Sequence, residues 1–180
     1  MEQSIMPEQR MMSEGPATDQ GVMPEGQATT DQGVAHEQVQ MLDTINEEFG
    51  LENVRPNEYS PLALAFIGDS VFDVVIKTII VEQANCQVNK LQKRTSEIVK
   101  AVSQARIADA LKDDLTEEEA NILRRGRNAK PYTKAKNASY GEYCKATGLE
   151  ALVGYLYLKG EEARIVELVK LGLEKAEMGI

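Results

Sequence analysis

Apolar residues recur three or four positions apart along the chain from residue 39 onward. This spacing places them on one face of a helix, whereas a half-buried strand would alternate apolar and polar residues. We find no convincing alternation of that kind. The pattern therefore predicts an all-α domain, whose first helix carries Val39, Leu42, Ile45 and Phe49 and ends at Gly50.

Three further segments carry the helical pattern. The most apolar one runs from Leu62 to about Ala84 and predicts one or two buried helices, with Gly68 as a break or a point of close packing. Residues 91–111 predict a single amphipathic helix. Residues 161–176 predict the last helix of the domain.

Two capping boxes indicate where two more helices begin. In this motif a Ser or Thr side chain caps the first turn, and a Glu three residues later reaches back to the cap residue. Thr116 and Glu119 open one such helix. Ser139 and Glu142 open the other, which continues through residues 144–158.

The first 36 residues lack a periodic apolar face. ATDQGV at positions 17–22 nearly recurs as TTDQGV at positions 29–34, and Gly, Gln, Thr, Pro, Met and Glu are abundant. Such a segment cannot bury enough surface to offset the entropy of ordering. We therefore predict a disordered acidic tail over residues 1–36 and one folded domain over residues 37–180.

The formal net charge of the chain is −9, which by itself argues against binding to nucleic acid. The distribution of charge reverses that conclusion, because residues 1–58 hold 12 acidic and 2 basic side chains, while residues 59–180 hold 17 acidic and 18 basic. Seven of those basic residues fall between Arg124 and Lys145, against one acid, Glu142. The folded part therefore carries a local cationic patch.

Cys86 and Cys144 form neither a CxxC pair nor a disulfide framework, which is typical of a reducing compartment. The N-terminus has no basic start followed by an apolar run, so it does not resemble a secretory signal. No apolar run reaches the roughly 20 residues of a membrane span. We expect a cytoplasmic protein without a membrane partner.

Two acids interrupt the apolar segment, Asp69 directly after Gly68 and Asp73 one helical turn later on the same face. A carboxylate that leaves water without a partner costs on the order of several kcal/mol. The ordinary explanation is that Asp69 caps a helix after Gly68 and that Asp73 lies at a solvated edge. The alternative is that Asp69 has a positively charged partner elsewhere in the fold, with Asp73 as a supporting acceptor.

Glu150 is likewise a lone acid in an apolar segment, which runs to Leu158. A basic residue paired with Glu150 would explain it, and so would a divalent cation shared with Asp69. Carboxylate and water oxygens suit Mg²⁺, which retains several waters when only one or two protein carboxylates are present. Asp69 and Glu150 are therefore candidate ligands of Mg²⁺.

The stretch RRGRNAKPYTKAKN at residues 124–137 follows a predicted helix, and Gly126 and Pro131 predict that it is a loop. A solvated loop is the ordinary explanation, but guanidinium forks and ammonium charges at this density also suit phosphate contacts. Two acids beside such a stretch favour metal-assisted hydrolysis of a phosphodiester. The candidate RNA-binding residues are Arg124, Arg125, Arg127, Asn128, Lys130, Lys134 and Lys136.

Three segments, in this order, resemble the catalytic domain of the ribonuclease III family: SPLALAFIGDSVF at 60–72, RRGRNAK at 124–130 and TGLEALVGYLYL at 147–158. The resemblance covers about residues 55–175 and is greatest to the compact Mini-ribonuclease III branch, which lacks a double-stranded-RNA-binding domain. It implies an all-helical homodimer that cleaves double-stranded RNA with Mg²⁺. By position it makes Asp69 and Glu150 the catalytic and metal-binding acids.

The same resemblance implies a substrate and partners. The substrate would be the precursor of 23S ribosomal RNA, trimmed at the stem that pairs its two ends, with 5′-phosphate products. A ribosomal protein is a candidate accessory partner. The apolar face around residues 62–72 is our candidate for the subunit interface, although it could equally be plain core.

The chain departs from ribonuclease III proper at two positions that are acidic there, because Ala65 and Thr147 stand in their place. A catalytically inactive protein of the same fold, binding RNA or the ribosome, is therefore the alternative function. The Mini branch is similarly sparse in acids at these positions. We accordingly expect an active endoribonuclease.

Overall fold

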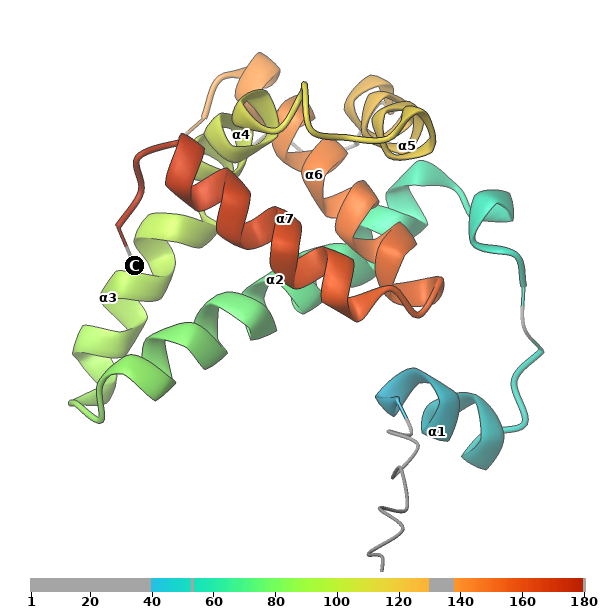
Figure 1. The fold of residues 1–180 in the computed structure, drawn as a ribbon, viewed down its shortest axis with the longest axis horizontal. Coiled ribbons are helices and arrows are strands. Elements are labelled where there is room, and N and C mark those ends of the chain that lie inside the picture. The colour runs from blue at the N-terminus through green and yellow to red at the C-terminus, as the bar shows by residue number, and fades with distance from the viewer. Residues whose placement is uncertain (1–39, 53, 130–137, 180) are drawn as a thin grey trace, which may run out of the picture. The chain divides into compact units, whose positions relative to one another are not determined.

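The computed structural model describes residues 40–52, 54–129 and 138–179, and within these ranges every regular element is helical. The predicted all-α fold class is confirmed (Figure 1). Residues 38–180 form one compact unit, whereas the predicted tail, residues 1–36, lies outside the described residues. The elements are α1 (Met41–Glu48), the short 3₁₀ helix η1 (Pro56–Glu58), α2 (Pro61–Gln83), α3 (Val88–Val99), α4 (Ala101–Ala110), α5 (Glu117–Asn128), α6 (Tyr140–Leu158) and α7 (Glu162–Lys175).

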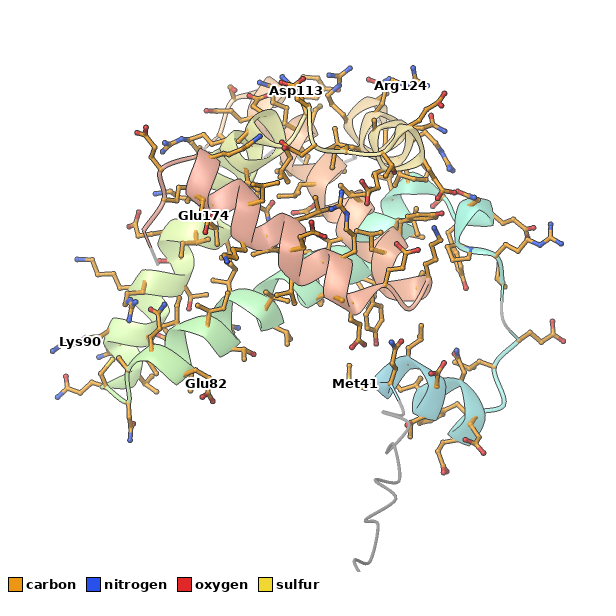
Figure 2. All side chains as sticks on the ribbon, in the orientation of Figure 1. Met41, Glu82, Lys90, Asp113, Arg124 and Glu174 are labelled. Carbon is orange, nitrogen blue, oxygen red and sulfur yellow. The ribbon has the colours of Figure 1, made fainter. Side chains whose placement is uncertain are left out.

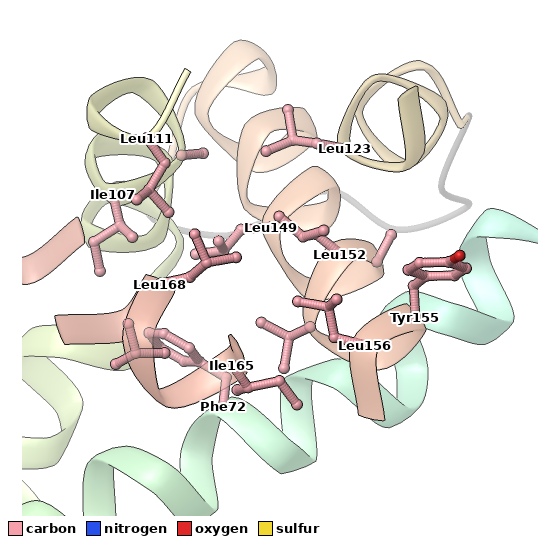
Figure 3. Packing of buried hydrophobic residues seen from close by; sticks show 14 of the residues in the cluster. Phe72, Ile107, Leu111, Leu123, Leu149, Leu152, Tyr155, Leu156, Ile165 and Leu168 are labelled. Atoms are coloured by element: carbon pink, nitrogen blue, oxygen red, sulfur yellow. The ribbon is translucent and has the colours of Figure 1, made fainter. Parts of the chain in front are cut away.

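Helix α6 is the centre of the domain. It packs against α2, α4, α5 and α7, and its residues from 151 to 157 are buried on every side. Figure 3 shows Leu152 and Leu156 of α6 gathered with Ile165 and Leu168 of α7, and with Phe72 of α2. A helix that is apolar around its whole circumference belongs in a core, which explains why this segment lacks a polar face.

Helix α2 is a single helix through the whole apolar segment. It begins at Pro61, whose missing N–H suits the first helical position, and the Ser60 hydroxyl accepts a hydrogen bond from the Ala63 N–H at 3.1 Å. The helix continues through Gly68 without a break. Asp69 therefore lies inside the helix and does not cap it.

Both capping boxes are confirmed, and Glu119 of the first one also ties α5 to α7. Its carboxylate is 4% exposed and accepts hydrogen bonds from Nε and Nη2 of Arg164, at 2.8 and 3.0 Å. Arg164 also donates to the carbonyl oxygen of Asp114 at 3.0 Å. A bidentate pair of this kind fixes the angle of α7 on the domain as well as its position.

The prediction of one helix over residues 91–111 is wrong, because α3 and α4 are separated at Lys100, whose backbone is extended. The Ser103 hydroxyl donates to the carbonyl oxygen of Glu97 at 2.6 Å, satisfying a group that the end of α3 leaves without a helical partner. The predicted inward residues Ala105, Ala108 and Leu111 are nevertheless buried, and Gln104 and Ile107 are buried with them.

The prediction of a loop from Arg124 is wrong for residues 124–128, which form the last turns of α5. Gly126 does not break the helix, since it is buried where α5 packs against α6. Basic side chains near a helix C-terminus also interact favourably with its dipole. Lys130, Lys134 and Lys136 lie outside the described residues.

Helix α1 confirms the first predicted helix, but none of its residues is buried. Leu42 packs against the core, and the Gln40 side chain donates to the carbonyl oxygen of Gly160 at 3.1 Å. Phe49, directly after the helix, is 76% exposed. No helix in the described ranges is long and apolar enough to cross a membrane.

Candidate active site

Helices α2 and α6 cross with their backbones in contact, at two glycines. A Cβ atom at Gly68 would lie 1.8 Å from the carbonyl oxygen of Glu150, and one at Gly154 would lie 2.0 Å from the carbonyl oxygen of Leu64. Only residues without a side chain allow this approach. Because Asp69 follows Gly68 directly, the crossing brings the two predicted acids, Asp69 and Glu150, to the same place.

Both carboxylates lie in surroundings that disfavour their negative charge. Burial first, and then the charge of Asp69, raises the pKa of Glu150 to about 7. Burial first, and then the charge of Asp73, raises the pKa of Asp69. Within the described part of the chain, no Lys, Arg or His lowers the pKa of either acid. Pairing with a basic residue therefore does not explain Glu150 there.

A buried amide lies against both acids. Gln104 of α4 is 1% exposed, and it lowers the pKa of Asp69 and of Glu150 by acting on each as a hydrogen-bond donor. Its Nε2 nevertheless has no described partner at full hydrogen-bonding distance and angle. The contact with each carboxylate is therefore long or poorly aligned, and we regard Gln104 as adjacent to the acids but not firmly bonded to them.

Asp73 does not join this group as a third ligand. Its carboxylate accepts a hydrogen bond from Lys77, one turn further along α2. Nowhere in the described ranges, this site included, is a cluster of three or more His, Cys, Asp or Glu residues placed to hold a metal ion.

The arrangement fits a hard divalent cation. Two close carboxylates with raised pKa values supply uncompensated negative charge, and their oxygens are the ligand type that Mg²⁺ and similar ions prefer. With two protein carboxylates, such an ion would keep several of its waters. Asp69 and Glu150 are the residues that would hold it.

The two positions that depart from ribonuclease III proper lie in the packed interior. Ala65 is buried on α2. Thr147 is buried on α6, and its hydroxyl donates to the carbonyl oxygen of Tyr143 at 3.0 Å. These positions therefore contribute packing in this chain and add no charge to the site.

The basic end of α5 lies close to Glu150 along α6. A Cβ atom at Gly126 would lie 2.6 Å from the Cβ of Ala151, and one at Gly148 would lie 3.3 Å from the Cβ of Arg127. These contacts place the last turn of α5 within two residues of Glu150 on α6. Arg124 and Arg127 are exposed there, and Figure 2 shows Arg124 at the outer edge of α5.

Arg125 points in a different direction from its two basic neighbours. Its guanidinium donates to the carbonyl oxygens of Asn57 at 3.5 Å and of Tyr59 at 3.2 Å. It is half-buried and ties η1 and the start of α2 to α5. Of the predicted RNA-binding arginines, Arg125 is thus the one with internal partners that hold the fold together.

Neither acid lines the two grooves beside the basic end of α5. A groove of about 1180 Å³ runs beside Arg124, Arg125 and Lys159, and a smaller one of about 460 Å³ lies beside Pro61 and Asn128. Because the acids lie outside both grooves, their position suits a large substrate that lies across the surface better than a small molecule bound in a cavity.

The ribonuclease III domain model matches residues 62–161, which include both acids and the basic end of α5. The chain belongs to the ribonuclease III family. It is 48% identical over 118 residues to the Mini-ribonuclease 3 of a Thermoanaerobacter species, covering 66% of this chain and 83% of that one. It is 42% identical over 128 residues to the Mini-ribonuclease 3 of Clostridium tetani, covering 71% and 83%.

A solved structure shares the fold of this ribonuclease III family member. The crystal structure of a Fusobacterium nucleatum protein superposes with a TM-score of 0.59 at 31% identity, covering 65% of this chain and 93% of that one. Ribonuclease III family enzymes are metal-dependent endoribonucleases that act on double-stranded RNA. The chain is accordingly an endoribonuclease, a hydrolase of phosphodiester bonds.

Sequence reasoning did not single out Gln104. The signal was present, because Gln104 stands at i, i+3, i+4 and i+7 spacing with Ile107, Ala108 and Leu111. The face predicted for residues 91–111 ran through Ala105, Ala108 and Leu111, which are indeed buried, and it passed over Gln104 because only apolar residues were assigned to it.

Proposed function

We propose that Asp69 and Glu150 together hold Mg²⁺ and that the enzyme uses this site to cut double-stranded RNA, maturing the ends of the 23S ribosomal RNA precursor. One observation supports the site above all others. Two carboxylates from different helices meet at a glycine-mediated crossing, and both have raised pKa values without a basic partner in the described ranges. Such an arrangement is costly unless a cation completes it.

When bound, Mg²⁺ supplies Lewis acidity toward the scissile phosphate and a water of lowered pKa. The task of the protein is to present two deprotonated carboxylates at a fixed spacing. Asp69 and Glu150 lose their protons at the site, and the lack of a side chain at Gly68 lets α2 lie directly against the Glu150 backbone. Cleavage is expected to leave 5′-phosphate and 3′-hydroxyl ends.

Substrate binding is assigned to the end of α5 and the basic residues that follow. Arg127 and Asn128 follow Arg124 by three and four residues, so each lies on the same side of the helix as Arg124. We propose that they contact phosphates and 2′-hydroxyls across the minor groove of an A-form duplex. Lys130, Lys134 and Lys136 extend the same basic stretch in the sequence.

A homodimer would match the two strands of the duplex, with each subunit cutting one strand. Within the proposed interface around residues 62–72, one side of α2 is buried core, including Leu64 and Phe72. The other side presents Phe66, which is 81% exposed. We place Phe66 in the proposed interface, where a second copy of the chain would suit a twofold substrate.

The ribosomal part of the proposal is supported by the resemblance to the Mini-ribonuclease III branch. Action on precursor ribosomal RNA would place the enzyme in the cytoplasm, with a ribosomal protein as a candidate accessory partner. An inactive RNA-binding protein of the same fold remains the rival, and the retained acid pair weighs against it.

The test is to incubate the full chain with precursor 23S ribosomal RNA and with a random duplex, in Mg²⁺ and in EDTA. We expect cleavage only in Mg²⁺, and none in Asp69→Asn or Glu150→Gln, with duplex binding preserved in both variants. Glu97→Gln is the matched control, because Glu97 is an exposed acid on α3 paired with Lys100. Duplex binding without cleavage by the wild type would favour the inactive rival, and full activity in either acid variant would contradict the mechanism.

A further inference from the structure

Gln104 is a polar side chain in an otherwise apolar stripe. Ile107 and Leu111, on the same face, are fully buried, and Gln104 is as inaccessible as they are. A buried amide nitrogen without a full hydrogen bond costs free energy, so an apolar residue of the same size would pack here at lower cost. Packing alone therefore does not explain this residue.

The direction of the side chain supplies an explanation. Gln104 comes from α4, Asp69 from α2 and Glu150 from α6, and the amide acts on both carboxylates. Helices α2 and α4 both pack against α6, so Gln104 approaches from inside the fold while Asp69 lies at its exposed edge. The site has a third member that carries no charge.

We propose that Gln104 is a positioning residue whose amide N–H groups lie between the carboxylates of Asp69 and Glu150 and hold them at the spacing that one divalent cation requires. This proposal rests on the function proposed above. The long contacts described here would tighten when the cation draws both acids into their deprotonated forms.

A neutral donor suits this role better than a basic residue. The side-chain amide carries two N–H donors, enough for one hydrogen bond to each acid. A Lys or Arg at the same position would neutralise the acids and compete with the cation for them. The amide orients the carboxylates while the full negative charge stays available.

The experiment is a calorimetric titration of the full-length protein with Mg²⁺, comparing wild type with Gln104→Met and Gln104→Asn. Met fills a similar volume without N–H groups, and Asn keeps the amide on a shorter side chain. Loss of a residue that orients metal ligands typically weakens metal affinity about 10- to 100-fold. We expect a loss of that size for Gln104→Met and a smaller loss for Gln104→Asn.

Ser103→Ala is the matched control. Ser103 is the buried neighbour on α4, and its hydroxyl bonds to the carbonyl oxygen of Glu97, away from the acids. We expect this variant to lose thermal stability without a change in its Mg²⁺ dissociation constant. Circular dichroism of each variant, and the shift of its melting temperature on addition of Mg²⁺, separate folding from binding.

Wild-type Mg²⁺ affinity in a folded Gln104→Met variant would overturn the proposal. If Gln104→Met does not fold, wild-type affinity in Gln104→Asn together with an unchanged Mg²⁺-induced melting shift would overturn it instead. A wild-type chain that binds no Mg²⁺ would contradict the proposed metal site itself, so the two failures are distinguishable.

Discussion

A Cβ atom at Gly68 would lie 1.8 Å from the carbonyl oxygen of Glu150. The backbone of one acid-bearing helix therefore rests directly on the backbone of the other. This contact sets the spacing of the two acids, because Glu150 lies at the crossing and Asp69 directly follows Gly68. Gly68, which the sequence pattern allowed as a break in an apolar segment, is thus a structural part of the proposed active site.

Gly68→Ala should separate α2 from α6, because backbone atoms at the crossing cannot move aside as a flexible side chain can. We expect a loss of about 3 kcal/mol in the free energy of unfolding, at the upper end for overpacking, together with loss of cleavage. Gly141→Ala is the control, since nothing lies within 4 Å of the added Cβ there. Urea unfolding of both variants checks this, and an equal effect in the two would contradict it.

Glu150→Gln should make the metal-free protein more stable at pH 8. Burial and the charge of Asp69 raise the pKa of Glu150 in the folded state from 4.5 to about 7. The folded chain thus holds this proton more tightly than the unfolded chain. The corresponding stability is fully present below pH 4.5 and is lost as the pH rises to about 7.

A Gln side chain does not titrate and so undergoes no such loss. The free energy of unfolding of Glu150→Gln should therefore exceed that of the wild type by on the order of 1–3 kcal/mol at pH 8, and by little at pH 4. Urea unfolding at the two pH values, in EDTA, measures the difference. Added Mg²⁺ should stabilise the wild type at pH 8 but not the variant. A variant less stable than wild type at pH 8 would show that Glu150 has a favourable partner in the absence of metal.

Replacing Arg124 and Arg127 by Ala should weaken binding to a duplex and reduce its salt dependence, by about one unit of log–log slope for each lost phosphate contact. Fluorescence anisotropy over a series of salt concentrations measures that slope. Arg125→Ala should instead lower the melting temperature, because Arg125 bonds to the carbonyl oxygens of Asn57 and Tyr59. Retention of the wild-type slope in the double variant would remove this turn of α5 from the RNA interface.

Phe66→Glu should dissociate the proposed dimer without unfolding the subunit, because the side chain is 81% exposed in the single chain. Analytical ultracentrifugation of the variant should show monomers, with a loss of double-strand cleavage. Val88→Glu, at an exposed apolar position at the start of α3, is the control and should leave the assembly intact. A Phe66→Glu protein that remains dimeric would place the interface elsewhere.

The sequence was informative where local chemistry decides the structure. Ser139 with Glu142 located the start of α6, and the lone acids in apolar segments pointed to Asp69 and Glu150, which the fold brings together. It misled at Gly126, where local propensity predicts a loop. Burial against α6 overrides that propensity, and such a contact between distant segments leaves no mark in a local pattern.

Gln104 shows the same limit for the site. Its place beside both acids depends on the packing of α4 and α2 against α6, which are distant in the sequence. Arg125 shows the same limit for the basic stretch. The sequence does not distinguish an arginine that donates hydrogen bonds to backbone carbonyl oxygens from one that faces solvent.

The proposed mechanism requires Asp69 and Glu150 to share one divalent cation. The most direct measurement is an anomalous difference map from crystals of the full chain soaked in Mn²⁺, used in place of Mg²⁺. The account predicts a peak bound by carboxylate oxygens of both residues, directly or through a single water. An enzyme that cleaves duplex RNA with Mn²⁺ but shows its anomalous peak away from these two acids would contradict it.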